Sequence, residues 1–208
     1  CAPAEPLDAE VTQATVARIM KLFKRFPRRG GAGPARGRFE HYEPLADDEA
    51  CANSVANTQV RLVTGNLPEG VLAPFLAAKL VGIPKATGGL RALGCGGVIR
   101  RILGKAVAAE FKKVLREASG EKQYGLQEDG CGRLHRALSA YAAMHKDSVV
   151  LAVDVADAFT RISRQAVIDA VAKHAPRVAT VAENWLGKEV VHTVSSSQGQ
   201  GMPATQVR

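Results

Sequence analysis

The chain has 208 residues, and its 46% apolar content lies within the usual range of globular proteins, so it can bury a core. A net charge of +8 favours an anionic partner such as nucleic acid. No apolar run approaches the roughly 20 residues that cross a bilayer, so we expect no membrane partner. The cysteines are scattered, which argues against a thiolate zinc site and a disulfide framework and favours a reducing, intracellular compartment.

The N-terminal region is predicted to be helical and basic. Asp8 is suited to cap a helix that runs to Phe26, and Pro27 ends it. From Val11 to Phe39 the chain carries many arginines and lysines but no acidic residue. This pattern predicts either an arm that binds a nucleic-acid backbone or a solvated helix followed by a flexible linker, for which residues 28–38 are the clearest candidate.

The remaining pattern predicts an α+β fold. Helices are expected over residues 43–64, 68–79, 98–118, 133–144, 163–175 and 177–186. Strands are expected over residues 80–85, 90–93, 148–153 and 189–195, with the first two joined in a tight hairpin.

The predicted strand over residues 148–153 is apolar throughout and ends in Asp154. A carboxylate at the end of a buried strand is usually paired, caps a helix or binds a metal ion. Asp154 and Asp157 suit an ordinary cap, whereas the position of Asp154 favours a metal ligand. The spacing alone leaves both interpretations open.

Residues 151–159 (LAVDVADAF), followed by Ser163 and Arg164, resemble the first palm motif of reverse transcriptases of the non-LTR retrotransposon type. The resemblance implies that Asp154 is catalytic and binds two magnesium ions together with the backbone carbonyl of Val155. It also implies that the dNTP pocket is lined by Asp157, Ala158 and Phe159. The phenylalanine ring would exclude a 2′-hydroxyl and so select deoxynucleotides.

Residues 80–91 (LVGIPKATGGLR) resemble the fingers motif of the same family, with Lys85 and Arg91 on either side of a glycine turn. Two cations placed in this way can converge on one triphosphate. The family usually has proline after the arginine, whereas this chain has Ala92. The helix that follows would face the nucleic-acid backbone with Arg100, Arg101 and Lys105.

Residues 195–205 resemble the second palm motif, a Gln-Gly-x-Pro turn. Gln200 and Gly201 give the best alignment and would contact the dNTP. Gln198 and Gly199 offer an alternative register. Many relatives carry an acidic residue where Met202 stands.

Together the motifs predict an RNA-directed DNA polymerase of a retrotransposon that adds dNTPs to a primer 3′-hydroxyl by two-metal nucleotidyl transfer, using Mg²⁺. Its expected partners are an RNA template and a DNA primer, and its expected location is the nucleus. Residues 80–208 would form an incomplete right-hand fingers and palm, after a basic helical region over residues 1–79.

No third palm motif with adjacent aspartates precedes Arg208, so we expect a fragment that is inactive by itself. The alternative is a non-catalytic basic nucleic-acid-binding module or a decayed polymerase remnant.

Overall fold

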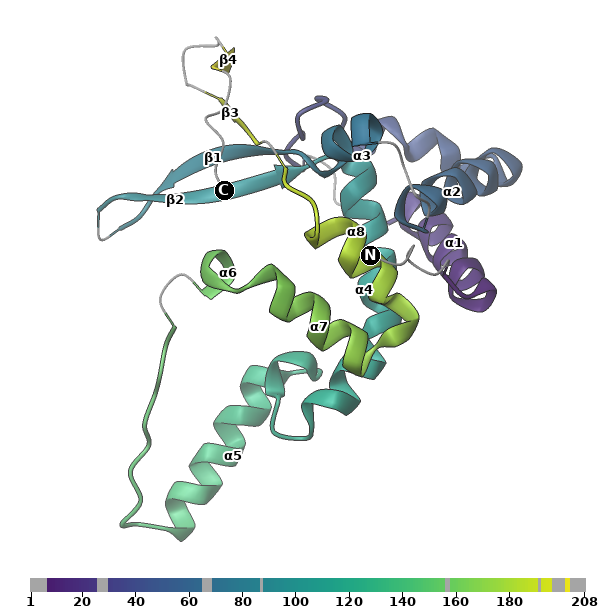
Figure 1. The fold of residues 1–208 in the computed structure, drawn as a ribbon. Helices are drawn as coiled ribbons and strands as arrows, with labels where there is room; N and C mark the ends of the chain where they lie inside the picture. The colour runs from purple at the N-terminus through teal and green to yellow at the C-terminus, as the bar shows by residue number, and fades with distance from the viewer. Residues whose placement is uncertain are drawn as a thin grey trace.

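The computed structural model describes residues 7–25, 30–64, 69–86, 88–155, 158–190, 192–195 and 201–202. Within these ranges the chain is mixed α and β: a helical body carries a small sheet, from which a long hairpin projects (Figure 1). The predicted α+β class is therefore confirmed. No helix in the described ranges is both long and apolar enough to cross a membrane.

The elements follow one another along the chain with short connections. The α-helices are α1 (Ala9–Phe23), α2 (Glu49–Thr64), α3 (Glu69–Leu76), α4 (Val98–Ser119), α5 (Gly130–Met144), α6 (Ala158–Arg161), α7 (Arg164–His174) and α8 (Ala179–Leu186). Four short 3-10 helices are η1 (Phe39–His41), η2 (Glu43–Ala46), η3 (Tyr124–Leu126) and η4 (Pro176–Val178). The strands are β1 (Ala78–Pro84), β2 (Leu90–Gly96), β3 (Thr193–Ser195) and β4 (Gly201–Met202).

The main core lies where α1, α2, α4 and α8 meet. Ile19 of α1, with Ile102 and Leu103 of α4, is completely inaccessible to solvent. These residues fall on one side of each helix, as the 3.6-residue period requires. The ion pair between Arg18 and Glu110 joins α1 to α4 at the edge of this core. The core thus combines side chains from both sides of the predicted boundary at residues 79 and 80.

The start of α1 agrees with the sequence prediction. The Asp8 carboxylate accepts a hydrogen bond of 2.9 Å from the backbone N–H of Glu10. Arg177 also binds this carboxylate at 3.0 Å, and the two hydrogen bonds lower the pKa of Asp8. The cap and the ion pair together fasten the beginning of α1 to the chain just before α8.

The sheet has the strand order β2-β1-β3-β4. β1 and β2 pair antiparallel from Ala78↔Gly96 to Pro84↔Leu90, and β3 runs parallel to β1. Gly88 and Gly89 have φ of +86° and +83°, a conformation that glycine adopts without steric cost. The predicted hairpin is confirmed. The helix predicted over residues 68–79 ends earlier, however, because the chain joins the sheet at Ala78.

The strand predicted over residues 148–153 is wrong in this structure. The segment has no regular secondary structure, and Val149 and Leu151 are 92% and 83% exposed. A strand needs a neighbouring backbone to satisfy its N–H and C=O groups, and no described strand pairs with this segment. It runs instead as a separate connection between α5 and α6 (Figure 1). We call residues 148–155 the apolar strap.

The segment predicted as a flexible linker over residues 28–38 lies partly outside the described residues, which resume at residue 30. Its described part packs against the start of α4. Arg101 Nη2 donates a 2.7 Å hydrogen bond to the carbonyl of Gly31. A Cβ atom at Gly33 would lie 2.7 Å from the carbonyl oxygen of Gly96, so only glycine allows this approach. Close backbone packing therefore holds the described part of this segment in place, although its composition predicted a flexible linker.

Other boundaries differ from the predictions by a few residues. The helix predicted over residues 43–64 is divided into η2 and α2, because Asp48 caps a new start by accepting a 2.9 Å hydrogen bond from the N–H of Cys51. The helix predicted over residues 177–186 likewise consists of η4 and α8, and the last predicted strand is reduced to β3. The helices predicted over residues 98–118 and 163–175 are confirmed as α4 and α7.

Candidate functional site

The tip of the β1–β2 hairpin carries Lys85 and Arg91 on one face. Arg91 is paired with Ile83, and the N–H of Lys85 donates a 3.0 Å hydrogen bond to the carbonyl of Gly89, which extends the ladder by one pair. Because side chains alternate between faces, Lys85, Ile83 and Arg91 all project to the same side. Diagonal neighbours across such a ladder are roughly 7–8 Å apart, so both cations can reach one polyanionic group.

Lys85 and Arg91 are both exposed, and neither has an ion-pair or hydrogen-bond partner for its side chain among the described residues. The same face continues along the hairpin with apolar side chains that are 38–48% exposed: Val81, Ile83 and Leu93. We call these five residues the fingertip face. It combines two free positive charges with an uncovered apolar strip.

The opposite face of the hairpin closes over a cavity of about 370 Å³ at its base. The cavity is lined by Ala78, Leu80, Gly94, Gly96, Arg100, Arg101, Trp185 and His192. The guanidinium of Arg100 donates a hydrogen bond to the carbonyl of Leu76, and burial lowers its pKa. The guanidinium of Arg101 lies 4.3 Å from the centre of the Phe39 ring. Both arginines therefore hold α4 against its neighbours.

His192 joins this cavity to the sheet. Its Nδ1 accepts a 3.2 Å hydrogen bond from the N–H of Ala78, so the neutral ring carries its proton on Nε2. Burial, followed by the positive charges of Arg100 and Arg164, lowers the pKa of His192. A neutral imidazole thus fixes the chain just before β3 to the first residue of β1.

The residues predicted to line the catalytic centre are only partly described. Asp154 and Val155 are exposed at the end of the apolar strap, and Ala158 is exposed at the start of α6. Asp157, Gln200 and the side chain of Phe159 lie outside the described residues. Gly201 lies in β4, paired with Ser195. Lys105, predicted to contact nucleic acid, is exposed on α4.

The described residues do not assemble a magnesium site around Asp154. Within them, no three His, Cys, Asp or Glu side chains lie close enough to hold a metal ion. A single exposed carboxylate and one carbonyl do not fit a pair of Mg²⁺ ions, which need several oxygen ligands. We therefore derive no reaction step through a metal from this geometry.

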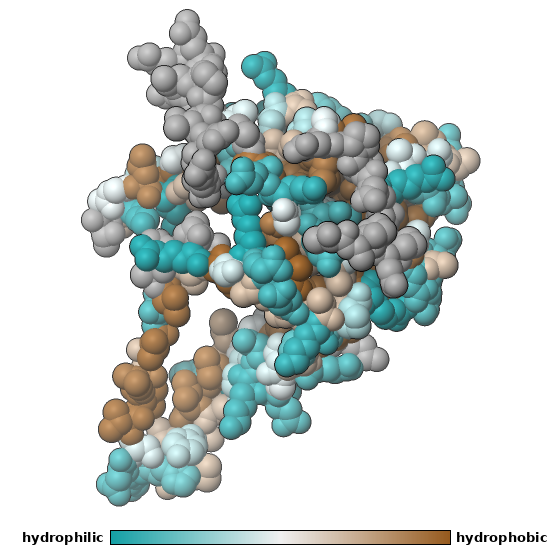
Figure 2. Space-filling view, viewed as in Figure 1, coloured by the Kyte–Doolittle hydropathy of each residue, from teal (hydrophilic) through white to brown (hydrophobic). Residues whose placement is uncertain are grey.

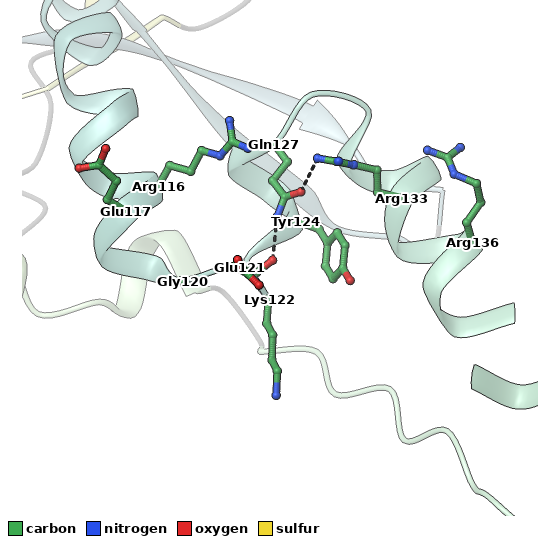
Figure 3. A pocket seen from close by; sticks show the side chains of 9 residues that line it. All are labelled: Arg116, Glu117, Gly120, Glu121, Lys122, Tyr124, Gln127, Arg133 and Arg136. Carbon is green, nitrogen blue, oxygen red and sulfur yellow. Dashed lines mark hydrogen bonds between the residues drawn. The ribbon is translucent and has the colours of Figure 1, made fainter. Parts of the chain in front are cut away.

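A second, larger concave region lies between the end of α4 and the start of α5 (Figure 3). We call it the basic concavity. Its volume is about 1040 Å³, and it is lined by Arg116, Glu117, Gly120, Glu121, Lys122, Tyr124, Gln127, Arg133 and Arg136. The sequence pattern did not predict this region. The only available signal was the recurrence of basic residues on both sides of a short loop, which is common on solvated helices.

A scan of the chain against protein-family models found no match, and a search of curated proteins found no significant match.

Proposed function

We propose that this chain supplies the nucleotide-binding fingers and the early palm of an RNA-directed DNA polymerase of the reverse-transcriptase type. The observation that carries the proposal is the fingertip face, where Lys85 and Arg91 project to the same side of a glycine-tipped hairpin. A dNTP presents several phosphate charges within a short distance. One ammonium and one guanidinium on adjacent ladder positions match that arrangement.

The hairpin geometry also gives these cations a suitable setting. The two residues with positive φ, Gly88 and Gly89, leave open space at the tip, since a Cβ atom at either position would meet no heavy atom within 4 Å. A triphosphate can therefore approach the turn closely. The exposed apolar strip beside the cations offers a surface for the rest of the nucleotide or for the template base.

In the proposed enzyme, Asp154 and the carbonyl of Val155 contribute oxygen ligands, and further carboxylates are needed to complete a magnesium pair. Asp157, Ala158, Phe159, Gln200 and Gly201 belong to the proposed dNTP pocket by resemblance alone. The RNA template and DNA primer would lie along α4 on the side of Lys105. By the same resemblance, the proposed enzyme acts in the nucleus.

Photochemical labelling with a reactive dATP analogue tests the proposal on the purified chain. We expect label on the peptide that contains residues 85–91, competed by unlabelled dNTPs. Lys85→Ala and Arg91→Ala should each weaken labelling about tenfold, because each removes a charge-assisted hydrogen bond to phosphate. Lys173→Ala, an exposed lysine on α7, serves as the matched control. Labelling that is unchanged in both hairpin variants would contradict the proposal.

A second candidate function is a non-catalytic nucleic-acid-binding module, favoured by exposed cations outside the hairpin. Lys21 in the last turn of α1 and Lys24 and Arg25 just after it are exposed, and the basic concavity adds another group. This function predicts oligonucleotide binding that weakens with salt. It predicts no dNTP labelling at the hairpin, so the experiment above separates the two functions.

A further inference from the structure

The basic concavity is held in shape by a hydrogen-bonded loop. Gln127 is the central residue: its Nε2 donates to the carbonyl of Glu121 and its Oε1 accepts from Arg133 Nη1, both at 2.8 Å. Both bonds are drawn in Figure 3. Arg136 Nη2 donates at 2.8 Å to the Asp129 carboxylate at the start of α5. These bonds close the loop on itself and fix it to the start of α5.

Two glycines at the start of α5 permit this arrangement. A Cβ atom at Gly130 would lie 2.0 Å from the carbonyl oxygen of Tyr124, and one at Gly132 would lie 2.5 Å from the Asp129 carboxylate. At Gly130 the obstacle is backbone, so any other residue would push the loop away from the helix, whereas at Gly132 the Asp129 side chain would have to move. The close approach keeps η3 and its Tyr124 ring between the two basic helices, as Figure 3 shows.

The charges of the basic concavity are not neutralised internally. Among the residues the structure covers, Arg116 and Lys122 have no side-chain partner, and Arg133 is bonded only to a neutral amide oxygen. Arg136 does have a carboxylate partner, but both groups are largely exposed. Glu117 and Glu121 also line the region. With Asp129 included, its four cations against three carboxylates leave an excess of one positive charge.

These features suit a chain of phosphates better than a single anion. A volume of about 1040 Å³ is far larger than one phosphate group and remains open to solvent. Guanidinium groups bind phosphate oxygens in a bidentate manner, and an aromatic ring among them provides a surface on which a base can stack. Tyr124 is partly buried, so part of its surface remains open to such a base.

We propose that the basic concavity binds the backbone of a single-stranded polynucleotide, with a base stacked on Tyr124. Arg116 and Arg133 contact phosphates from the two helices, and Lys122 adds a charge at the edge, where its side chain points away from the other cations (Figure 3). No residue of the β1–β2 hairpin lines this region. The site is therefore separate from the proposed dNTP contact, and the two proposals stand independently.

Fluorescence anisotropy with a labelled single-stranded oligonucleotide of about 12 nucleotides, within the usual span of such sites, tests the inference. Arg116→Gln and Lys122→Gln should each weaken binding about three- to tenfold and reduce the slope of log K against log salt by about 0.7. Arg61→Gln and Lys173→Gln are the matched controls. They change the same residue types at exposed positions on α2 and α7, away from the concavity. If each concavity variant binds the oligonucleotide as tightly as its matched control, the inference is overturned.

The aromatic ring gives a second, independent readout. Tyr124→Leu should weaken oligonucleotide binding about fivefold or more, because a stacked base is lost, whereas Tyr124→Phe should retain it. Polyglutamate of similar charge serves as the competitor. Polyglutamate binding as tight as that of the oligonucleotide, and insensitive to Tyr124→Leu, would indicate an acidic protein partner and would overturn the inference.

The hairpin variants distinguish this inference from the proposed function. We expect Lys85→Ala to retain oligonucleotide binding at the concavity while it loses dNTP labelling. The unmodified chain could show no dNTP labelling at the hairpin while Arg116→Gln and Lys122→Gln still weaken oligonucleotide binding. That result would contradict only the proposed function. Conversely, dNTP labelling could occur at the hairpin while Arg116→Gln binds the oligonucleotide as tightly as the unmodified chain. That result would contradict only this inference.

Discussion

His192 connects the protonation state of one side chain to the attachment of β3. Its unprotonated Nδ1 accepts the N–H of Ala78, and the described residues that line the cavity around it include two arginines and no acidic residue. Burial and the charges of Arg100 and Arg164 oppose a proton on this ring and lower its pKa. Protonation of Nδ1 would also remove the acceptor on which the hydrogen bond depends.

We predict a specific loss of stability below neutral pH. Above the ordinary histidine pKa of about 6.5, the ring is neutral in both the folded and the unfolded chain. Below it, the unfolded chain takes up a proton that the folded chain resists, so the free energy of unfolding falls as the pH drops towards the lowered pKa. Urea unfolding at about pH 7.5 and pH 5.5, followed by the fluorescence of Trp185, measures this loss.

His192→Asn is the informative variant, since the amide oxygen can still accept the Ala78 N–H but does not titrate. Its free energy of unfolding should fall less than that of the unmodified chain over the same pH interval. The difference between the two chains isolates His192 from the other titrating groups. An identical pH dependence in both chains would show that the ring does not couple protonation to folding.

The two parts of the candidate site were not equally predictable from the sequence. Lys85 and Arg91 could be placed because a proline, two glycines and short apolar flanks form a local hairpin signal. The surroundings of Asp154 could not be placed, because a strand requires backbone partners from distant parts of the chain. The basic concavity was missed for a similar reason: Arg116 and Arg133 come together only through the fold of the loop between them.

At the scale of elements, α4 is the central support of the molecule. Its buried side contacts α1, α2 and α7, and its first turn carries Arg100 and Arg101, which donate hydrogen bonds to the carbonyls of Leu76 and Gly31. The sequence predicted this helix well because its apolar residues recur with helical spacing over six turns. Both candidate sites are attached to it, with the hairpin before its first residue and the basic concavity at its end.

We predict that Leu103→Ala lowers the free energy of unfolding by about 2–5 kcal/mol, since Leu103 is fully buried and its removal leaves a cavity. Leu134→Ala makes the same chemical change on α5, where the side chain is 42% exposed. It should cost well under half as much. Chemical denaturation of both variants gives the comparison, and a similar cost at the two positions would place Leu134 in a packed core.

At the scale of the whole molecule, a large apolar surface is left uncovered. The apolar strap exposes Val149, Leu151 and Val153, and α5 exposes a stripe of Leu134, Leu138 and Tyr141. Figure 2 shows hydrophobic surface over the strap and over part of the neighbouring helix. Soluble monomers rarely expose contiguous apolar patches of this kind unless the patch contacts another surface.

The helices were predicted correctly and the strap was not, and this difference has a physical origin. Helices such as α1, α4 and α7 satisfy their own backbone hydrogen bonds, so periodicity along the sequence is enough to predict them. The strap has the apolar, β-branched composition of a strand, but composition alone supplies no hydrogen-bonding partner. Residues 148–153 therefore have the composition of a strand without its conformation, and the strand prediction is wrong.

We predict that the strap is exposed in solution and promotes association. The double variant Val149→Ser, Leu151→Ser should bind less of a hydrophobic fluorescent dye and show less concentration-dependent self-association in analytical ultracentrifugation. Its free energy of unfolding should change by no more than about 0.5 kcal/mol per substitution, because surface changes away from packed groups cost little. Ile168→Ser, at a buried position on α7, is the control that should be strongly destabilising. A cost of several kcal/mol for the strap variant would mean that these residues are packed against α5 or against another strand, and would contradict the prediction.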